Sequence, residues 1–101
     1  MPGRMTLRLL RESGEPIKST TDMGGFVLRC AASGEWRLLG SVDELGDTYF
    51  ESAQMPELLA DWNEAWALVS SFPDENCWHK VRALLVECAA GPRLCLHCSG
   101  D

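Results

Sequence analysis

The chain has 101 residues, of which 46% are hydrophobic, and its 15 acidic residues against nine basic ones give a formal net charge of −6. This length suits one domain with a two-layer core, and the hydrophobic content excludes a disordered chain. The negative charge argues against binding of nucleic acid or of an anionic membrane, because both require basic patches, and it is compatible with a basic protein partner.

We expect residues 1–101 to form a single domain in the cytoplasm. No run of about 18 apolar residues occurs, so no segment is predicted to span a membrane. The N-terminus alternates polar with apolar side chains instead of forming the apolar region of a signal peptide. In a reducing compartment the cysteines should be thiols. The five cysteines are Cys30, Cys77, Cys88, Cys95 and Cys98.

The first part of the chain is predicted to be a strand followed by a loop. Met5, Leu7 and Leu9 fall on one face of an extended segment, which predicts a half-buried strand over residues 5–11. Residues 18–25 are polar and end in paired glycines, so they are predicted to form an exposed, mobile loop.

Two apolar segments, residues 26–31 and 36–39, flank a short loop that contains Gly34. Phe26 and Leu28 would share one face of the first segment, which is the period of a strand. Because glycine can adopt a positive φ in a tight turn, this pattern predicts a β-hairpin.

A helix is predicted to begin near Pro56, since proline suits a first helical position. Before it, residues 40–47 are predicted to be a loop and residues 48–50 a short extended piece. The helix would bury one stripe with helical spacing. This stripe consists of Met55, Leu58, Leu59, Trp62, Ala65, Trp66 and Val69. The two tryptophans are predicted core residues, although either could remain half-exposed and anchor a partner.

A second helix is predicted to follow and to end at about Ala90, where Gly91 in a left-handed conformation and Pro92 would stop it. Residues 93–98 alternate again and should form the last strand, which is a candidate for the middle of the sheet. The expected fold class is α+β. It consists of an antiparallel sheet of about four strands with two helices packed on one face, and the strands precede the helices except for the last one.

The acidic residues are concentrated in one part of the chain. Seven of the 15 acids lie between positions 43 and 64, and no basic residue occurs between Arg37 and Lys80. These acids are Asp43, Glu44, Asp47, Glu51, Glu57, Asp61 and Glu64. The last three line up along one side of the predicted helix. The pattern is compatible with a solvated helix face and with a surface that binds a basic partner.

No residue pattern predicts a metal site or a catalytic site. Cys95 and Cys98 would point to opposite faces of a strand, and Cys77 and His79 would lie about 200° apart on a helix. We therefore expect the cysteines to be core residues. Neither His79 nor His97 lies near a nucleophile loop. We predict a protein that is not an enzyme and that carries no metal or cofactor.

The motif Gly-Asp-Thr-Tyr-Phe at 46–50, the Gln54 that precedes a leucine-rich acidic helix, and the closing Gly100-Asp101 resemble features of a group of small bacterial proteins. Members show an Asp-Thr-x-Phe-Asn segment, a Gln, two helices and a terminal strand ending in Gly-Asp, whereas here Glu51 stands in place of the Asn. Small acidic α+β proteins of this kind are similar to the immunity proteins of bacterial toxin systems, including contact-dependent inhibition.

The resemblance implies an immunity protein that binds and neutralises a cognate toxin. Because the chain is acidic, we expect a basic nuclease whose nucleic-acid groove would be blocked by the seven acids. The alternative is a non-enzymatic adaptor or structural protein that acts as a homodimer through a sheet edge or an exposed tryptophan. Its association should tolerate salt, whereas binding of a basic toxin should weaken with salt.

Overall fold

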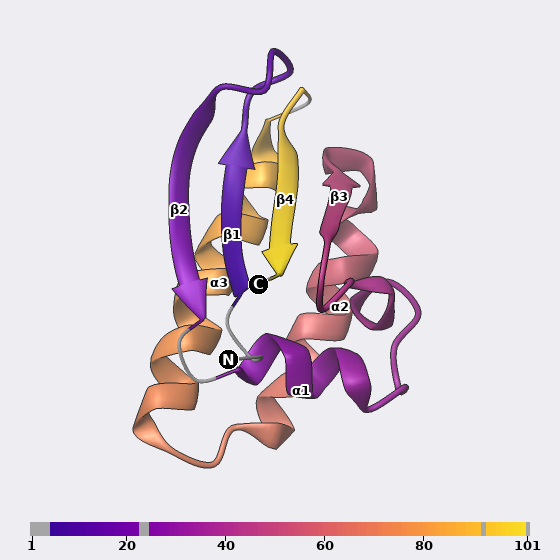
Figure 1. Ribbon diagram of the computed structural model, residues 1–101, viewed down its shortest axis with the longest axis vertical. Helices are drawn as coiled ribbons and strands as arrows, with labels where there is room; N and C mark the ends of the chain where they lie inside the picture. The colour runs from indigo at the N-terminus through magenta and orange to yellow at the C-terminus, as the bar shows by residue number, and fades with distance from the viewer. Residues whose placement is uncertain (1–4, 23–24, 92, 101) are drawn as a thin grey trace.

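The computed structural model describes residues 5–22, 25–91 and 93–100. The main elements are β1 (Met5–Leu10), β2 (Pro16–Asp22), α1 (Phe26–Ala32), β3 (Asp47–Glu51), α2 (Met55–Ala65), α3 (Phe72–Ala90) and β4 (Cys95–Gly100). Short 3-10 turns are η1 (Leu39–Ser41), η2 (Ser52–Gln54) and η3 (Trp66–Leu68). The four strands form one antiparallel sheet in the order β2-β1-β4-β3 (Figure 1). The predicted α+β class and the predicted middle position of the last strand are both confirmed.

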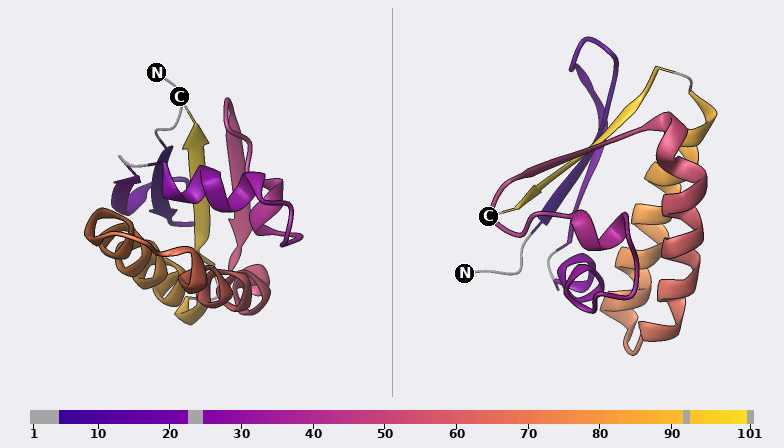
Figure 2. Two further views of the ribbon diagram at one scale, coloured as in Figure 1. Left: turned by 90° about the horizontal axis from the view of Figure 1, so that it is seen from below. Right: turned by 90° about the vertical axis from the view of Figure 1, so that its right-hand side faces the viewer.

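Two helices, α2 and α3, lie side by side on one face of the sheet, as predicted. The sheet and this helix pair diverge at one end, and α1 fills the gap between them (Figure 2). Among the described residues no helix covers the opposite face of the sheet, which we call the open face (Figure 2). None of the helices within residues 5–22, 25–91 and 93–100 is long and apolar enough to cross a bilayer.

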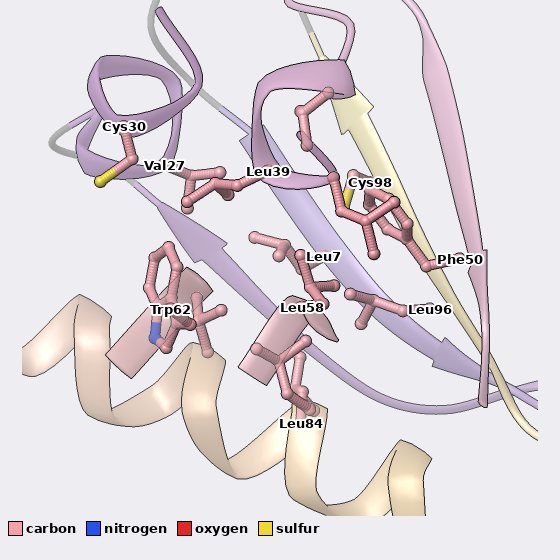
Figure 3. Packing of buried hydrophobic residues seen from close by; sticks show 14 of the residues in the cluster. Leu7, Val27, Cys30, Leu39, Phe50, Leu58, Trp62, Leu84, Leu96 and Cys98 are labelled. Atoms are coloured by element: carbon pink, nitrogen blue, oxygen red, sulfur yellow. The ribbon is translucent and has the colours of Figure 1, made fainter. Parts of the chain in front are cut away.

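Trp62 lies at the centre of the core. It is 1% exposed, and its ring meets the ring of Phe26 edge to face at 5.7 Å. Its Nε1 donates to the Trp78 carbonyl at 3.0 Å, and the Nε1 of Trp78 donates back to the Trp62 carbonyl at 2.8 Å. This side chain therefore joins α1, α2 and α3. Figure 3 shows it in a core with side chains from the sheet, α1 and α3, including Leu7, Val27, Phe50, Leu84 and Leu96.

Residues 26–31 form α1, so the predicted hairpin is wrong. Val27 is buried together with the residues on both sides of it, which is incompatible with the alternation of a strand. The carboxylate of Asp22 accepts the N–H of Val27 at 2.7 Å and so satisfies one free donor of the first helical turn. Gly34 has the predicted positive φ, 74°, but it follows the end of a helix instead of turning a hairpin.

Residues 16–22 form strand β2, where the sequence predicted an exposed loop over 18–25; residues 23 and 24 of that loop lie outside the described residues. A tight turn joins β1 to β2, with hydrogen bonds from Arg11 N to Glu15 O at 2.9 Å and from Gly14 N to Arg11 O at 2.8 Å. No residue of 16–21 belongs to the buried apolar core. This strand is therefore formed by backbone pairing with β1. Its polar side chains lack the hydrophobic alternation from which a strand is predicted.

The segment 36–39 is a turn that leads into η1, and not the predicted second strand of a hairpin. The predicted end of the second helix at Ala90 is confirmed, but Gly91 has a φ of −108° and is not left-handed. The Leu94 side chain lies where a Cβ of residue 91 would be, so a larger residue at this position would require Leu94 to move. Pro92 and Asp101 lie outside the described residues.

An ion pair joins α1 to the first turn of α3. Arg29 Nη2 donates to Asp74 Oδ1 at 2.6 Å, and the Ser70 hydroxyl donates to Asp74 Oδ2 at 3.2 Å. Burial raises the pKa of the Asp74 carboxyl, but the hydrogen bonds and charge of Arg29, with the hydroxyls of Ser70 and Ser71, outweigh burial, and the pKa is lowered.

The lowered pKa of Asp74 makes stability depend on pH. The stabilisation is present above the carboxyl pKa of the unfolded chain, about 3.9, and is lost as the pH falls towards the lower pKa of the folded state. We expect Asp74→Asn to cost about 1 kcal/mol at neutral pH, because Arg29 is half-exposed, and to reduce the loss of stability on acidification. Urea unfolding between neutral and acidic pH measures this effect. Glu75→Gln, which removes a charge from the same turn, is the control, and an equal change in its pH profile would contradict the assignment.

Candidate functional site

The seven acids predicted to bind a partner fall into two groups in the structure. Asp43 and Glu44 lie in the loop before β3, and Asp47 and Glu51 are the first and last residues of β3, which is an edge strand. Glu57, Asp61 and Glu64 lie on α2. Three of the seven therefore lie on a helix, and four lie on or just before an edge strand.

The three acids of α2 contact the segment 36–39, which lies between α1 and η1. Glu57 forms an ion pair with Arg37. Asp61 accepts the Leu39 N–H at 3.4 Å. Glu64 accepts a hydrogen bond from the Trp36 Nε1 at 3.0 Å. These contacts hold the segment against the helix, so the helix acids have a structural role that a solvated face would not have.

Asp61 is the least exposed of the three helix acids. Burial raises the pKa of its carboxyl, and the neighbouring charges of Glu57 and Glu64 raise it further, while the Leu39 N–H opposes the shift. A carboxylate in this environment is held by its own chain and is poorly placed to meet a partner.

The acids around β3 are exposed, although three of them also make local contacts. Asp43 Oδ1 accepts the Leu45 N–H at 2.9 Å and so shapes the loop. Asp47 Oδ1 contacts His97 Nε2 at 2.9 Å. Glu51 forms a capping box with Gln54, in which the Glu51 N–H donates to Gln54 Oε1 at 2.8 Å. These contacts leave the carboxylates at the surface and fix their positions.

Two large apolar side chains lie among these acids. Leu45 is 73% exposed and Tyr49 is 60% exposed. We use the term acidic β3 surface for the six residues Asp43, Glu44, Leu45, Asp47, Tyr49 and Glu51. Tyrosine is enriched at protein interfaces, whereas aspartate and glutamate are depleted there.

The Tyr49 ring stacks on the imidazole ring of His97. Tyr49 and His97 are directly opposite each other in the β3–β4 pair, and their rings stack with centroids 4.6 Å apart and an interplanar angle of 21°. Arg8 Nη1 approaches His97 Nδ1 at 3.5 Å from the other side. Because a carboxylate can only accept, His97 Nε2 is the donor in its hydrogen bond with Asp47 Oδ1. The imidazole is thus fixed between a cation and an anion, and Tyr49 is ordered on top of it.

A shallow hollow of about 540 Å³ lies beside Tyr49 on the open face. Leu10 and Cys95 form part of its lining, with Glu51 on one side and Arg11 and Arg93 on the other. Its position next to the acidic β3 surface extends the area that a partner could contact.

The thiols do not have the properties of nucleophiles. Burial raises the pKa of Cys88 to about 11 and of Cys30 and Cys98 to about 12, and it also raises the pKa of Cys77 and Cys95. Cys30, Cys88 and Cys98 are buried, which confirms the core prediction for these three. Within the described ranges no group of three or more His, Cys, Asp or Glu side chains is arranged to hold a metal ion.

His97 is also poorly placed to act as a general base. Asp47 engages its Nε2 and Arg8 approaches its Nδ1, so neither nitrogen is free to accept a proton from a substrate. The arrangement is suited to fixing an aromatic contact residue.

No family model matches this chain, and no similar curated protein or solved structure was found. The site residues predicted from the sequence include Asp47 and Glu51 but not Arg8, Tyr49 or His97. The alternation of the two strands places Tyr49 and His97 on outward-facing positions, but their pairing depends on a register that the sequence does not give.

A second exposed aromatic residue lies away from the acidic β3 surface. Trp66 is 43% exposed, whereas Trp62 is buried, so one of the two tryptophans does remain half-exposed. With Asn63, Trp78 and His79 it lines a hollow of about 370 Å³ on the helix pair. Its ring packs on Trp78 at 4.8 Å, which accounts for its position as part of the helix packing.

Proposed function

We propose that this protein is an immunity-type inhibitor, which binds a basic toxin protein through the acidic β3 surface and thereby neutralises it. The observation that supports the proposal is an exposed tyrosine, ordered on His97 and framed by Asp47 and Glu51, on an edge strand. A nuclease fits this proposal because the groove that binds nucleic acid must be basic. The proposal includes a cytoplasmic location and assigns no catalytic activity to this chain.

The two kinds of residue would have different roles in binding. Clustered carboxylates attract a basic partner over a distance and orient it, which increases the association rate. A tyrosine gives a large contact area at a low cost in conformational entropy, and that cost is lower still when the ring is already ordered. The surface would therefore combine fast association with a fixed central contact.

The proposed binding site contains only some of the acids that were predicted from the sequence. Asp43, Glu44, Asp47 and Glu51 remain in it. Glu57, Asp61 and Glu64 are assigned instead to holding the segment 36–39. Substitution of a helix acid should thus lower stability, while substitution of a β3 acid should lower affinity.

The test begins by capturing the partner on the immobilised protein from a lysate of the source cells, with washes at low and then high salt. A basic protein released by salt is then purified and assayed for nuclease activity with and without an equimolar amount of this chain. We expect Asp47→Lys/Glu51→Lys to weaken binding by about 10- to 100-fold at low salt and to flatten its salt dependence.

Glu15→Lys/Glu75→Lys is the matched control, because it makes the same change in net charge at exposed positions outside the acidic β3 surface. Equal loss of affinity in both variants would mean that only the overall charge matters. Absence of a basic partner, or a partner whose activity this chain leaves unchanged, would refute the proposed function.

A further inference from the structure

Strand β2 forms the edge of the sheet opposite to β3. The strand order is β2-β1-β4-β3, so β2 has a partner on only one side (Figure 1). It is seven residues long, and its side chains from Pro16 to Ser19 are exposed. An open edge of this length presents backbone N–H and C=O groups that can pair with another strand. Pro16, which cannot donate, stands at the end of the strand and leaves the rest able to pair.

A hollow separates β2 from α3. Lys18 and Thr20 lie opposite Leu9 and Leu7, two buried residues of the core face, so their side chains point towards the helix layer. Because these side chains are polar, the helix does not close onto the strand. The hollow has a volume of about 450 Å³, and α3 contributes Lys80, Ala83 and Glu87 to its lining.

We propose that β2 pairs with the β2 strand of a second copy of this chain, around a two-fold axis that passes beside Ser19. Ser19 is the middle residue of Pro16–Asp22. In this antiparallel pair Lys18 lies opposite Thr20 of the other copy, and Ile17 lies opposite Thr21. No like charges meet, and pairs of β-branched residues on one face favour strand association. The two four-stranded sheets become one continuous sheet.

The same axis places the two α3 helices side by side and antiparallel. Lys18 pairs with Glu87 at 2.7 Å, and both Lys80 and Glu87 line the hollow with Ser19, so the axis passes alongside α3, level with the residues between these two charges. Lys80 of one copy then lies level with Glu87 of the other. Among the described residues Lys80 has no ion-pair partner in its own chain, and the hollow gives these long side chains room to reach across the axis.

The β3 edge of the sheet is less suited to pairing with its own copy. Antiparallel self-pairing of β3 around Tyr49 would set Asp47 opposite Glu51 of the second copy, and directly opposed like charges destabilise a strand pair. Dimerisation through β2 therefore leaves the acidic β3 surface free at both ends of the joined sheet. The inference does not depend on the proposed function.

Charge reversal across the axis tests the dimer. Sedimentation equilibrium from micromolar to near-millimolar concentration should give a monomer–dimer equilibrium for the unmodified chain. Lys80→Glu would set two acids against each other at each contact and should raise the dissociation constant by about tenfold or more. Adding Glu87→Lys restores opposite charges across the axis, and Lys18→Glu is included with it to keep the ion pair within each chain, so this triple variant should recover most of the association. Arg82→Glu makes the same charge change on the side of α3 that faces Asn63, and it should leave the equilibrium unchanged.

Disulfide trapping tests the register. Ser19→Cys places one thiol on each side of the axis, at a Cα separation within the range of a disulfide. A small-molecule disulfide should oxidise these two thiols to an intermolecular disulfide and be reduced to its own thiols. The unmodified chain and Ser13→Cys, in the hairpin turn, serve as controls for reaction of other cysteines.

Several results would overturn the inference. One is a monomer at every concentration, and another is a dimer that neither responds to Lys80→Glu nor forms the Ser19→Cys disulfide. A dimer that dissociates in the Asp47→Lys/Glu51→Lys variant would also overturn it. Growth into longer polymers would indicate pairing of β2 with β3 instead. A dimer with both expected responses would support it whether or not a toxin partner exists.

Discussion

Replacing Trp62 with alanine is expected to destabilise the protein by about 3–5 kcal/mol. The side chain is fully buried, contacts Phe26 edge to face, and exchanges hydrogen bonds with Trp78. The substitution removes this packing and the hydrogen bond from the indole to the Trp78 carbonyl. A domain has roughly 5–15 kcal/mol of stability in total, so the variant should unfold at a much lower urea concentration.

Two further substitutions separate packing from hydrogen bonding. Trp62→Phe keeps most of the apolar contact and loses the Nε1 donor, which should cost about 1 kcal/mol, because one buried hydrogen bond is lost while the Trp78 carbonyl keeps its place in the hydrogen-bonding pattern of α3. Trp66→Ala removes the same type of side chain from a half-exposed position and should cost less than Trp62→Ala. Equal losses for Trp62→Ala and Trp66→Ala would show that Trp62 is not the centre of the core.

The elements that were predicted correctly are those whose side chains carry their own periodicity. The stripe predicted from Met55 to Val69 is a property of the local sequence, and it is buried at Met55, Leu58, Trp62 and Ala65, although the helix ends at Ala65 and Trp66 is half-exposed. The alternation that ends at Cys98 is also local, and Leu96 and Cys98 are buried. By contrast, β2 is polar and depends on backbone pairing with β1. Local pattern cannot reveal such a strand, because the interaction that forms it belongs to a neighbouring segment.

The first helix was missed for a different reason. Phe26, Leu28 and Cys30 alternate, but Val27 between them is also buried, since α1 fills the gap between the sheet and the helix pair. A short helix that is apolar on most sides has the same composition as a buried strand. The glycine that follows supplies a positive φ in either structure, so it could not distinguish them.

The candidate site also combines features that the local sequence predicts with features that depend on tertiary contacts. The sequence identified the acids but not which of them are used within the chain, because the contacts of Glu64 with Trp36 and of Asp47 with His97 join positions 28 and 50 residues apart. Tyr49 gained its role only through the register of β3 against β4. Charge is visible in a sequence, whereas the neutralisation and ordering of a charged surface depend on tertiary contacts.

Gly100 is expected to be essential for the position of the loop that carries Asp43 and Glu44. Its N–H donates to the Gly46 carbonyl at 2.8 Å, and a Cβ at this position would overlap the Glu44 carbonyl group and lie 2.9 Å from the Asp43 oxygen. All these atoms belong to the backbone, so the chain itself would have to move. A close approach of this kind gives a physical reason for glycine at position 100.

Gly100→Ala should therefore displace the loop or break the end of the β1–β4 pair, at a cost of about 1–3 kcal/mol. Gly40→Ala is the matched control, because its Cβ would meet only the Ala31 carbonyl oxygen at 3.8 Å, an ordinary contact. Urea unfolding gives the stability of each variant, and backbone amide chemical shifts show whether residues 43–46 have moved. If the partner binds through the acidic β3 surface, Gly100→Ala should also weaken binding without any change of charge, and Gly40→Ala should not. Unchanged shifts in the loop of the alanine variant would mean that Gly100 does not hold it in place.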